Sequence, residues 1–149
     1  MENLDLNFQA IKKEFFIYKN GIITESLRRL YPQGVVIYGL MVPQIAEIAR
    51  KYTKNLDLGK KLWNDANCRE SRLLALYVLP ADKIDKEFAK NLINEVRSNE
   101  EADLLAFKIL RLLPFGKDLY LEMKDYNMKG VQDYCRKMFR KNLEATNQI

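Results

Sequence analysis

Residues 62–80 read LWNDANCRESRLLALYVLP, and this stretch decides the fold. Its last part, residues 73–79, is almost wholly apolar, as is typical of a helix buried in a protein core. The polar run at 64–67 predicts a turn before that helix, so the stretch contains two helices joined by a short connection. The second helix opens on Arg69 and Arg72, although a helix N-terminus favours negative charge. The two arginines therefore need an explanation.

Apolar residues recur at spacings of three and four along most of the chain, which indicates amphipathic helices. We expect helices at about 1–20, 24–30, 43–53, 55–63 (from Asn55 or Asp57), 69–79, 85–96, 98–113, 117–125 and 127–145. The segment QGVVIYGLMVP, residues 33–43, is the one strand candidate by composition. Because a lone strand has no partner, we expect an extended connection there, followed by a helix with Pro43 in its first turn.

Two of the predicted helices are closed by prolines 34 residues apart, Pro80 and Pro114. At that offset three apolar residues of one helix fall on three of the other: Leu73, Leu76 and Leu79 on Phe107, Leu110 and Leu113. A period of this length is typical of helical-hairpin repeats of the HEAT or TPR type, which bury a core by stacking.

The sequence therefore predicts an all-α fold of HEAT-like helical repeats that form a superhelix, or solenoid, rather than a closed bundle. We expect a single domain over residues 1–149, with an N-terminal helix at 1–20 and a C-terminal capping helix at 127–145.

The composition bounds the class of protein. With 48% hydrophobic and 30% charged residues, the chain is typical of a globular protein rather than a disordered one. The longest apolar run, residues 35–42, is too short to span a bilayer, and the N-terminus lacks the pattern of a signal peptide. We therefore expect a cytoplasmic protein without a membrane partner, in which Cys68 and Cys135 are packing thiols. A net charge of +5 permits an anionic partner such as nucleic acid or an acidic protein.

Several classes of active site are excluded by what the sequence lacks. The chain contains no histidine, so a Ser–His or Cys–His nucleophile pair and a histidine-based metal site cannot form. Its six glycines do not make a GxGxxG or GK[ST] phosphate loop. We expect no cofactor and no metal, and any chemistry must depend on carboxylates, tyrosines, lysines or the bound ligand itself.

The charged residues each admit two interpretations. Arg69 and Arg72 are either solvated helix ends or contacts to phosphates of a polyanion. On the predicted last helix, basic side chains gather on one side: Lys129, Arg136 and Arg140, with Lys137 placed to pair with Asp133 at i,i+4. That side is either a solvated face or a second polyanion site.

Asn99, Glu100, Glu101 and Asp103 form an acidic helix start, within which Asp103 stands apart from the cap. Ser98 and Glu101 form a capping-box pattern at the start of their helix, whereas Asp103 lies beyond it and beside core positions. A carboxylate at a core edge suits a general base or the stabilisation of a developing cation. Trp63 has the spacing of a core residue, and its indole N–H needs a partner if it is buried.

Two segments resemble the signatures of a known family. Residues 38–49, YGLMVPQIAEIA, resemble the entry segment YGVxVPxLRxIA of the DNA alkylation repair family, the HEAT-like alkylpurine DNA glycosylases. Leu62-Trp63 followed by RESRLLA at 69–75 looks like the next signature of that family, a helical hairpin written LW…xRExRLLA. The resemblance covers about residues 20–115, and it gives Pro43 and Trp63 structural roles.

The resemblance implies a superhelix whose concave, basic face holds duplex DNA by its backbone. Glycosylases of this family act on cationic N3- and N7-alkylated purines, whose glycosidic bond is already weak. Tryptophans and one aspartate are thought to stabilise the oxocarbenium-like sugar and to position water. No metal or cofactor is required.

Carried over to this chain, the aspartate of the family falls on Asp103, and the tryptophan four residues before it falls on Asn99. The aspartate matches and the tryptophan does not. The resemblance therefore implies Asp103 as the catalytic carboxylate, and duplex DNA bearing alkylated bases as the partner. It implies DNA-backbone contacts by five basic residues: Arg69, Arg72, Lys60, Lys61 and Arg111. The alternative is a non-catalytic helical-repeat scaffold that binds other proteins.

Overall fold

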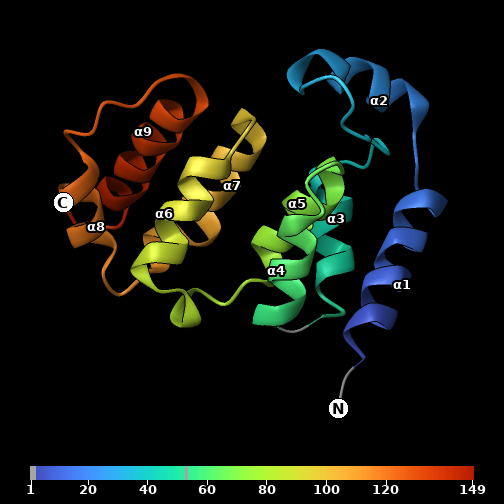
Figure 1. Cartoon of the computed structure of the whole chain (residues 1–149), viewed down its shortest axis with the longest axis horizontal. Coiled ribbons are helices and arrows are strands. Elements are labelled where there is room, and N and C mark those ends of the chain that lie inside the picture. Colours follow the sequence, from blue (N-terminus) through green and yellow to red (C-terminus); the bar gives the residue numbers. More distant parts are fainter. Residues whose placement is uncertain (1–2, 53) are drawn as a thin grey trace. The chain divides into compact units, whose positions relative to one another are not determined.

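The computed structural model describes residues 3–52 and 54–149, and within these ranges every regular element is a helix (Figure 1). The chain divides into two compact units, unit 1 (Met1–Leu79) and unit 2 (Pro80–Ile149). The all-α prediction is confirmed, whereas the single domain over residues 1–149 stays a prediction. None of the described helices is long and apolar enough to cross a membrane.

Unit 1 contains five α-helices and a short 3-10 helix: α1 (Leu4–Ile17), α2 (Gly21–Leu27), η1 (Arg28–Leu30), α3 (Val42–Ala49), α4 (Leu56–Asn64) and α5 (Arg69–Val78). Helix α5 is the centre of this unit, because nine of its ten residues are buried. It packs on α3 and α4, and α1 covers α4 (Figure 1). Gly59 allows the close approach of α4, since a Cβ there would lie 2.5 Å from the Leu79 side chain.

Unit 2 begins with the 3-10 helix η2 (Ala81–Lys83) and contains α6 (Lys86–Glu95), α7 (Asn99–Lys108), η3 (Leu110–Leu112), α8 (Gly116–Met123) and α9 (Gly130–Ala145). Helices α6, α7 and α8 all pack on α9. The buried face of α9 consists of Cys135, Phe139 and Leu143. Burial raises the pKa of the Cys135 thiol to about 12, as is expected of a cysteine that serves in packing.

Side-chain caps begin several helices where the sequence predicts them. The side chain of Asn55 accepts a hydrogen bond from Leu58 N at 3.0 Å, so Asn55 and not Asp57 begins α4. Asp85 caps α6, and Ser98 accepts a hydrogen bond from Glu101 N to cap α7. These caps satisfy backbone donors that the first turn of a helix cannot satisfy itself.

Several predicted helix boundaries are wrong. Helix α1 ends at Ile17 and not at residue 20, and α3 ends at Ala49 and not near residue 53. Helix α2 is capped by Asn20 and begins at Gly21, so Thr24 lies within the helix. The helix predicted from residue 98 to 113 ends at Lys108, after which the chain tightens into η3. Helix α9 begins at Gly130 and not near Asn127, and its N-cap Lys129 has an extended backbone with φ −132° and ψ 160°.

The proposed repeat register fails at one position. Phe107 is 47% exposed, whereas Leu73, its partner at an offset of 34 residues, is fully buried. The other two pairs, Leu76 with Leu110 and Leu79 with Leu113, are buried alike, so the mismatch is confined to Phe107.

The segment between η1 and α3 is extended, as its composition predicts. It contains one bridge to the start of α5: Val36 N donates to Asn67 O at 2.6 Å, and Arg69 N donates to Val36 O at 3.0 Å. A single bridge cannot hold an extended segment by itself, because an isolated pair of strands is only marginally stable in water. Side chains of other elements must therefore complete the attachment.

Gly39 lets this segment meet the start of α2. Its φ of +89° lies in the left-handed region, and a Cβ there would lie 2.2 Å from Asn20 O. Asn20 N donates to Tyr38 O at 2.8 Å, and Thr24 Oγ1 donates to Ile37 O at 2.9 Å. The backbone contact leaves no room for a side chain at position 39.

We expect Gly39→Ala to destabilise unit 1 by about 3 kcal/mol or more, because it combines a left-handed φ with a clash against backbone. Gly34→Ala is the matched control, since Gly34 has a φ of +96° but open space at its Cβ. The control should cost only about 1 kcal/mol. Urea unfolding followed by Trp63 fluorescence measures both, and equal losses would refute the close approach.

Candidate functional site

The carboxylate of Glu70 lies at the centre of the arginine-rich start of α5 and is fully buried. Its Oε1 accepts a hydrogen bond from Tyr38 N at 3.0 Å, and its Oε2 accepts from Gly39 N at 3.0 Å and Leu40 N at 3.3 Å. Arg69 Nη1 donates to Oε2 and to Leu40 O, both at 2.7 Å. Three backbone donors and one guanidinium thus converge on a single buried carboxylate.

This arrangement is a physical argument against the predicted DNA-backbone role for Arg69. The residue is only 2% exposed, and its charge is offset by Glu70 inside the unit. A guanidinium in this position can reach a phosphate only if the core opens. Its function is to neutralise Glu70, because a buried carboxylate without a counter-charge would be strongly destabilising.

Arg72 is also buried, at 5% exposure, and the same argument applies to it. Its guanidinium carbon lies 3.6 Å from the centroid of the Trp63 ring, which is itself 2% exposed. Planar stacking of arginine on an indole is a favourable cation–π arrangement. The pair joins α4 to α5, which is a structural role for Trp63.

We expect Glu70→Gln to destabilise the protein by about 3–5 kcal/mol, the usual cost of removing one partner of a buried charge pair. The amide would direct N–H groups at backbone donors and leave the Arg69 charge without its partner. Glu47→Gln is the control, because the Glu47 side chain is 69% exposed. Urea unfolding followed by circular dichroism should show a loss for Glu70→Gln and almost none for Glu47→Gln. Equal midpoints would contradict the role assigned to Glu70.

Lys60 and Lys61 lie on α4, also in unit 1. Lys60 is exposed, and Lys61 is half-buried. Lys61 Nζ lies 3.2 Å from Asp5 Oδ1 and 5.0 Å from the centroid of the Phe8 ring on α1. Both residues keep their predicted role as phosphate contacts, although a phosphate at Lys61 would compete with Asp5.

Asp103 lies on the exposed side of α7 in unit 2, as does Asn99 one turn before it. The hydroxyl of Tyr134, on α9, donates a hydrogen bond to Asp103 Oδ1 at 2.8 Å. This bond to the carboxylate raises the pKa of Tyr134, and burial and the negative charge of Asp103 act in the same direction. Asp103 is thus a solvent-accessible carboxylate whose orientation is set by one neighbouring phenol.

Sequence reasoning did not identify Tyr134 as a site residue, because helical spacing predicts it in a buried stripe with Val131, Cys135 and Met138, whereas the buried residues are Cys135, Phe139 and Leu143. Only its contact with a helix about 30 residues away distinguishes it from an ordinary partly buried tyrosine.

Basic residues of α9 surround Tyr134. A shallow cavity of about 300 Å³ is lined by Tyr134, Lys137, Met138, Arg140, Lys141 and Glu144. Lys137 pairs with Asp133 at 3.2 Å, which confirms the predicted i,i+4 contact. Arg136 is not part of this surface. It donates to Asp133 and to the carbonyls of Met123 and Tyr126, so it anchors the end of α8 to α9.

Arg111 lies on η3, just after α7. Its Nε donates to Phe107 O at 2.5 Å, and its guanidinium carbon lies 4.2 Å from the centroid of the Phe107 ring. The half-exposed guanidinium remains a predicted phosphate contact. Because Arg111 and Asp103 both belong to unit 2, this unit contains the candidate catalytic carboxylate and one of the candidate phosphate ligands.

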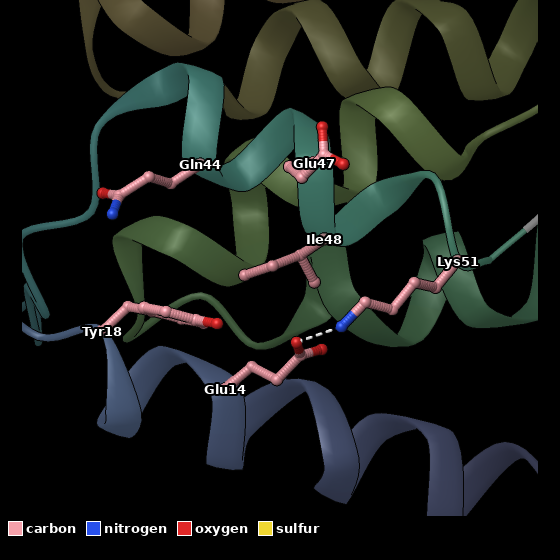
Figure 2. Close-up of a pocket in the computed structure, with 6 residues that line it drawn as sticks. All are labelled: Glu14, Tyr18, Gln44, Glu47, Ile48 and Lys51. Atoms are coloured by element: carbon pink, nitrogen blue, oxygen red, sulfur yellow. Dashed lines mark hydrogen bonds and ion pairs between the residues drawn. The ribbon is translucent and has the colours of Figure 1, made fainter.

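A separate cavity of about 290 Å³ lies between α1 and α3 in unit 1 (Figure 2). It is lined by Glu14, Tyr18, Gln44, Glu47, Ile48 and Lys51. Lys51 forms an ion pair with Glu14 across it, as Figure 2 shows, and the hydrogen bond to Glu14 raises the pKa of Lys51. The pair connects α1 with the end of α3, and the lining carries no arrangement of groups that we assign to catalysis.

Within residues 3–52 and 54–149, no three Cys, Asp or Glu side chains gather as a set of metal ligands. The candidate groups of unit 2 are the carboxylate of Asp103, the phenol of Tyr134 and the cations of Arg111 and α9.

The fold and these groups place the chain in a class of helical-repeat proteins, and the comparison with protein families gives the family. Residues 11–124 match the model of the family described as DNA alkylation repair enzyme. The match covers most of the chain, so this protein belongs to the DNA alkylation repair enzyme family. The resemblance seen in residues 38–49 and 62–75 is confirmed.

A solved structure described as "A new family of proteins related to the HEAT-like repeat DNA glycosylases with affinity for branched DNA structures" has a similar fold, with a TM-score of 0.77. The two sequences are 11% identical, and the similarity covers 89% of this chain and 55% of the other. At this identity the likeness establishes the fold alone, and it confirms the HEAT-like prediction. The chain spans about half the length of that solved structure. No protein of curated function matches the sequence.

We expect Asp103→Asn to lower the pKa of Tyr134, because the main cause of its raised value is the bond to the carboxylate. A pKa raised by folding means that the bond stabilises the protein below about pH 10 and that this contribution is lost as Tyr134 ionises. Ultraviolet titration of tyrosine ionisation, compared with the control Asp125→Asn, measures the change. Identical titrations would show that Asp103 and Tyr134 do not interact in solution.

Proposed function

We propose that this chain binds DNA through the sugar–phosphate backbone as a DNA repair protein. The observation that carries the proposal is the family match over residues 11–124, a range that includes Lys60, Lys61, Asp103 and Arg111. The net charge of +5 and the affinity of the structurally similar protein for branched DNA support nucleic acid as the partner.

The contacts to phosphate come from surface cations. In unit 1 they are Lys60 and Lys61, and in unit 2 they are Arg111 and the basic side chains of α9. Arg69 and Arg72 stabilise the core behind α4 and do not take part. Backbone contacts of this kind position a protein on DNA and release bound counterions, so binding should weaken steeply with salt.

Within this function we propose that unit 2 removes cationic N3- or N7-alkylated purines. Such a lesion is already a good leaving group, so the protein mainly has to stabilise the positive charge that develops on the sugar. Asp103 is exposed and carries negative charge at a fixed orientation. Tyr134 engages Oδ1, so Oδ2 is the oxygen that would face the sugar cation and orient the attacking water.

The test assays binding and base release together, on plain duplex DNA and on duplex DNA containing 7-methylguanine. Asp103→Asn should reduce release of the methylated base on the order of hundredfold or more, since a charge that acts only in the transition state is lost. Binding of either duplex should be unchanged and should weaken steeply between about 50 and 200 mM salt. Asp125→Asn removes an exposed carboxylate of the same unit and should leave release intact.

The outcomes separate the alternatives. Undiminished release by Asp103→Asn would refute the catalytic assignment. Salt-sensitive binding without release by the native chain would leave a DNA-binding protein that is not a glycosylase. No binding at low salt would refute the DNA proposal and favour the protein-interaction scaffold.

A further inference from the structure

The end of α7 presents an aromatic ring between a carboxylate and two cations. Phe107 is 47% exposed although Leu105 and Ala106, its neighbours on the same helix, are fully buried. Arg111 lies over its ring at 4.2 Å from guanidinium carbon to centroid, and Lys108 Nζ lies 5.5 Å from the same centroid. The ring is therefore not part of the buried face of α7, which consists of Glu101, Ala102, Leu105 and Ala106.

Helical spacing places the ring next to the candidate catalytic group. Asp103 and Phe107 are four residues apart and both exposed, so they are neighbours on one side of α7. Asp103 lies one turn before the ring, Lys108 directly follows Phe107 as the last residue of α7, and Arg111 lies on η3. The surface is therefore negative at one end, apolar in the middle and positive at the other.

A nucleotide has complementary chemistry. Its base offers a π-face that stacks on phenylalanine or on a guanidinium plane, and its phosphate pairs with arginine and lysine. In a regular duplex both faces of each base are already stacked on neighbouring bases, so an aromatic side chain adds little binding energy there. An unpaired base in a bulge or at a branch has an exposed face on which a side chain can stack.

We propose that Phe107, Arg111 and Lys108 form a binding site for one unpaired nucleotide of DNA. The base stacks on the Phe107–Arg111 pair, and the phosphate lies toward Arg111 and Lys108, away from Asp103. The sugar of that nucleotide then lies on the Asp103 side. This inference rests on the proposed function as far as DNA binding is concerned, and it does not depend on base release.

An acidic peptide could also use the two cations, but it would not need the ring. Nucleic acid is favoured because Phe107 and Arg111, whose guanidinium carbon lies 4.2 Å from the ring centroid, both offer planar groups on which a base can stack.

The experiment uses the full chain and two labelled duplexes of the same sequence, one fully paired and one with a single bulged 2-aminopurine. The native chain should bind the bulged duplex about tenfold more tightly, and stacking should quench the 2-aminopurine fluorescence. Phe107→Ala should abolish both the preference and the quenching while affinity for the paired duplex stays unchanged. Phe107→Trp should restore them, because it restores an aromatic face.

Phe16→Ala is the matched control. Phe16 is 59% exposed and has Lys19 Nζ 3.9 Å from its ring centroid, but it lies in unit 1, far in sequence from Asp103. It should not alter the preference for the bulged duplex. Circular dichroism checks that each variant folds.

The results distinguish the nucleotide site at Phe107 from the proposed DNA-binding function. Equal affinity of the native chain for both duplexes would overturn the nucleotide site and leave DNA binding standing. A preference that survives in Phe107→Ala, or that is lost equally in Phe16→Ala, would also overturn the site. If neither duplex binds but an acidic peptide does, both the proposed DNA-binding function and the nucleotide site are refuted.

Discussion

The carboxylate of Glu70 is the constraint on which unit 1 depends. The segment between η1 and α3 has neither a helix nor a sheet to satisfy its backbone, and a buried N–H without a partner is costly. Glu70 accepts hydrogen bonds from three consecutive N–H groups of this segment, and Arg69 neutralises the charge that burial would otherwise make unfavourable. Gly39 completes the arrangement, because only a residue without Cβ fits against the start of α2.

This constraint changes the meaning of the most suggestive feature of the sequence. Two arginines at the N-terminus of an apolar helix resemble a polyanion site. In the structure, however, Arg69 forms an ion pair with the buried Glu70, and Arg72 lies over the Trp63 ring. Both serve the junctions among α3, α4 and α5 that hold unit 1 together. The surface that meets DNA in our proposal is therefore built from residues outside this motif, and changes within the motif should affect stability before they affect binding.

In unit 2 the exposed side of α7 is a different kind of surface. Asp103, Phe107 and Arg111 follow one another at intervals of four residues, and Tyr134 fixes the carboxylate from α9. The core of the unit does not require these side chains to be where they are, since the buried face of α7 is formed by other residues. A charged group held by a single phenol, beside an aromatic ring and cations, is an arrangement that a ligand can use.

The sequence by itself determined the local structure and the family. Periodicity predicted the helices, and the caps at Asp85 and Ser98 followed from the need of a first turn for side-chain acceptors. The i,i+4 pair of Asp133 and Lys137 followed in the same way from helical spacing. Tertiary structure alone decided which charges are buried, because the partners of Glu70 lie some 30 residues away in sequence. It also decided that Phe107 is exposed, since periodicity identifies the apolar face of a helix but not which part of that face a neighbouring helix covers.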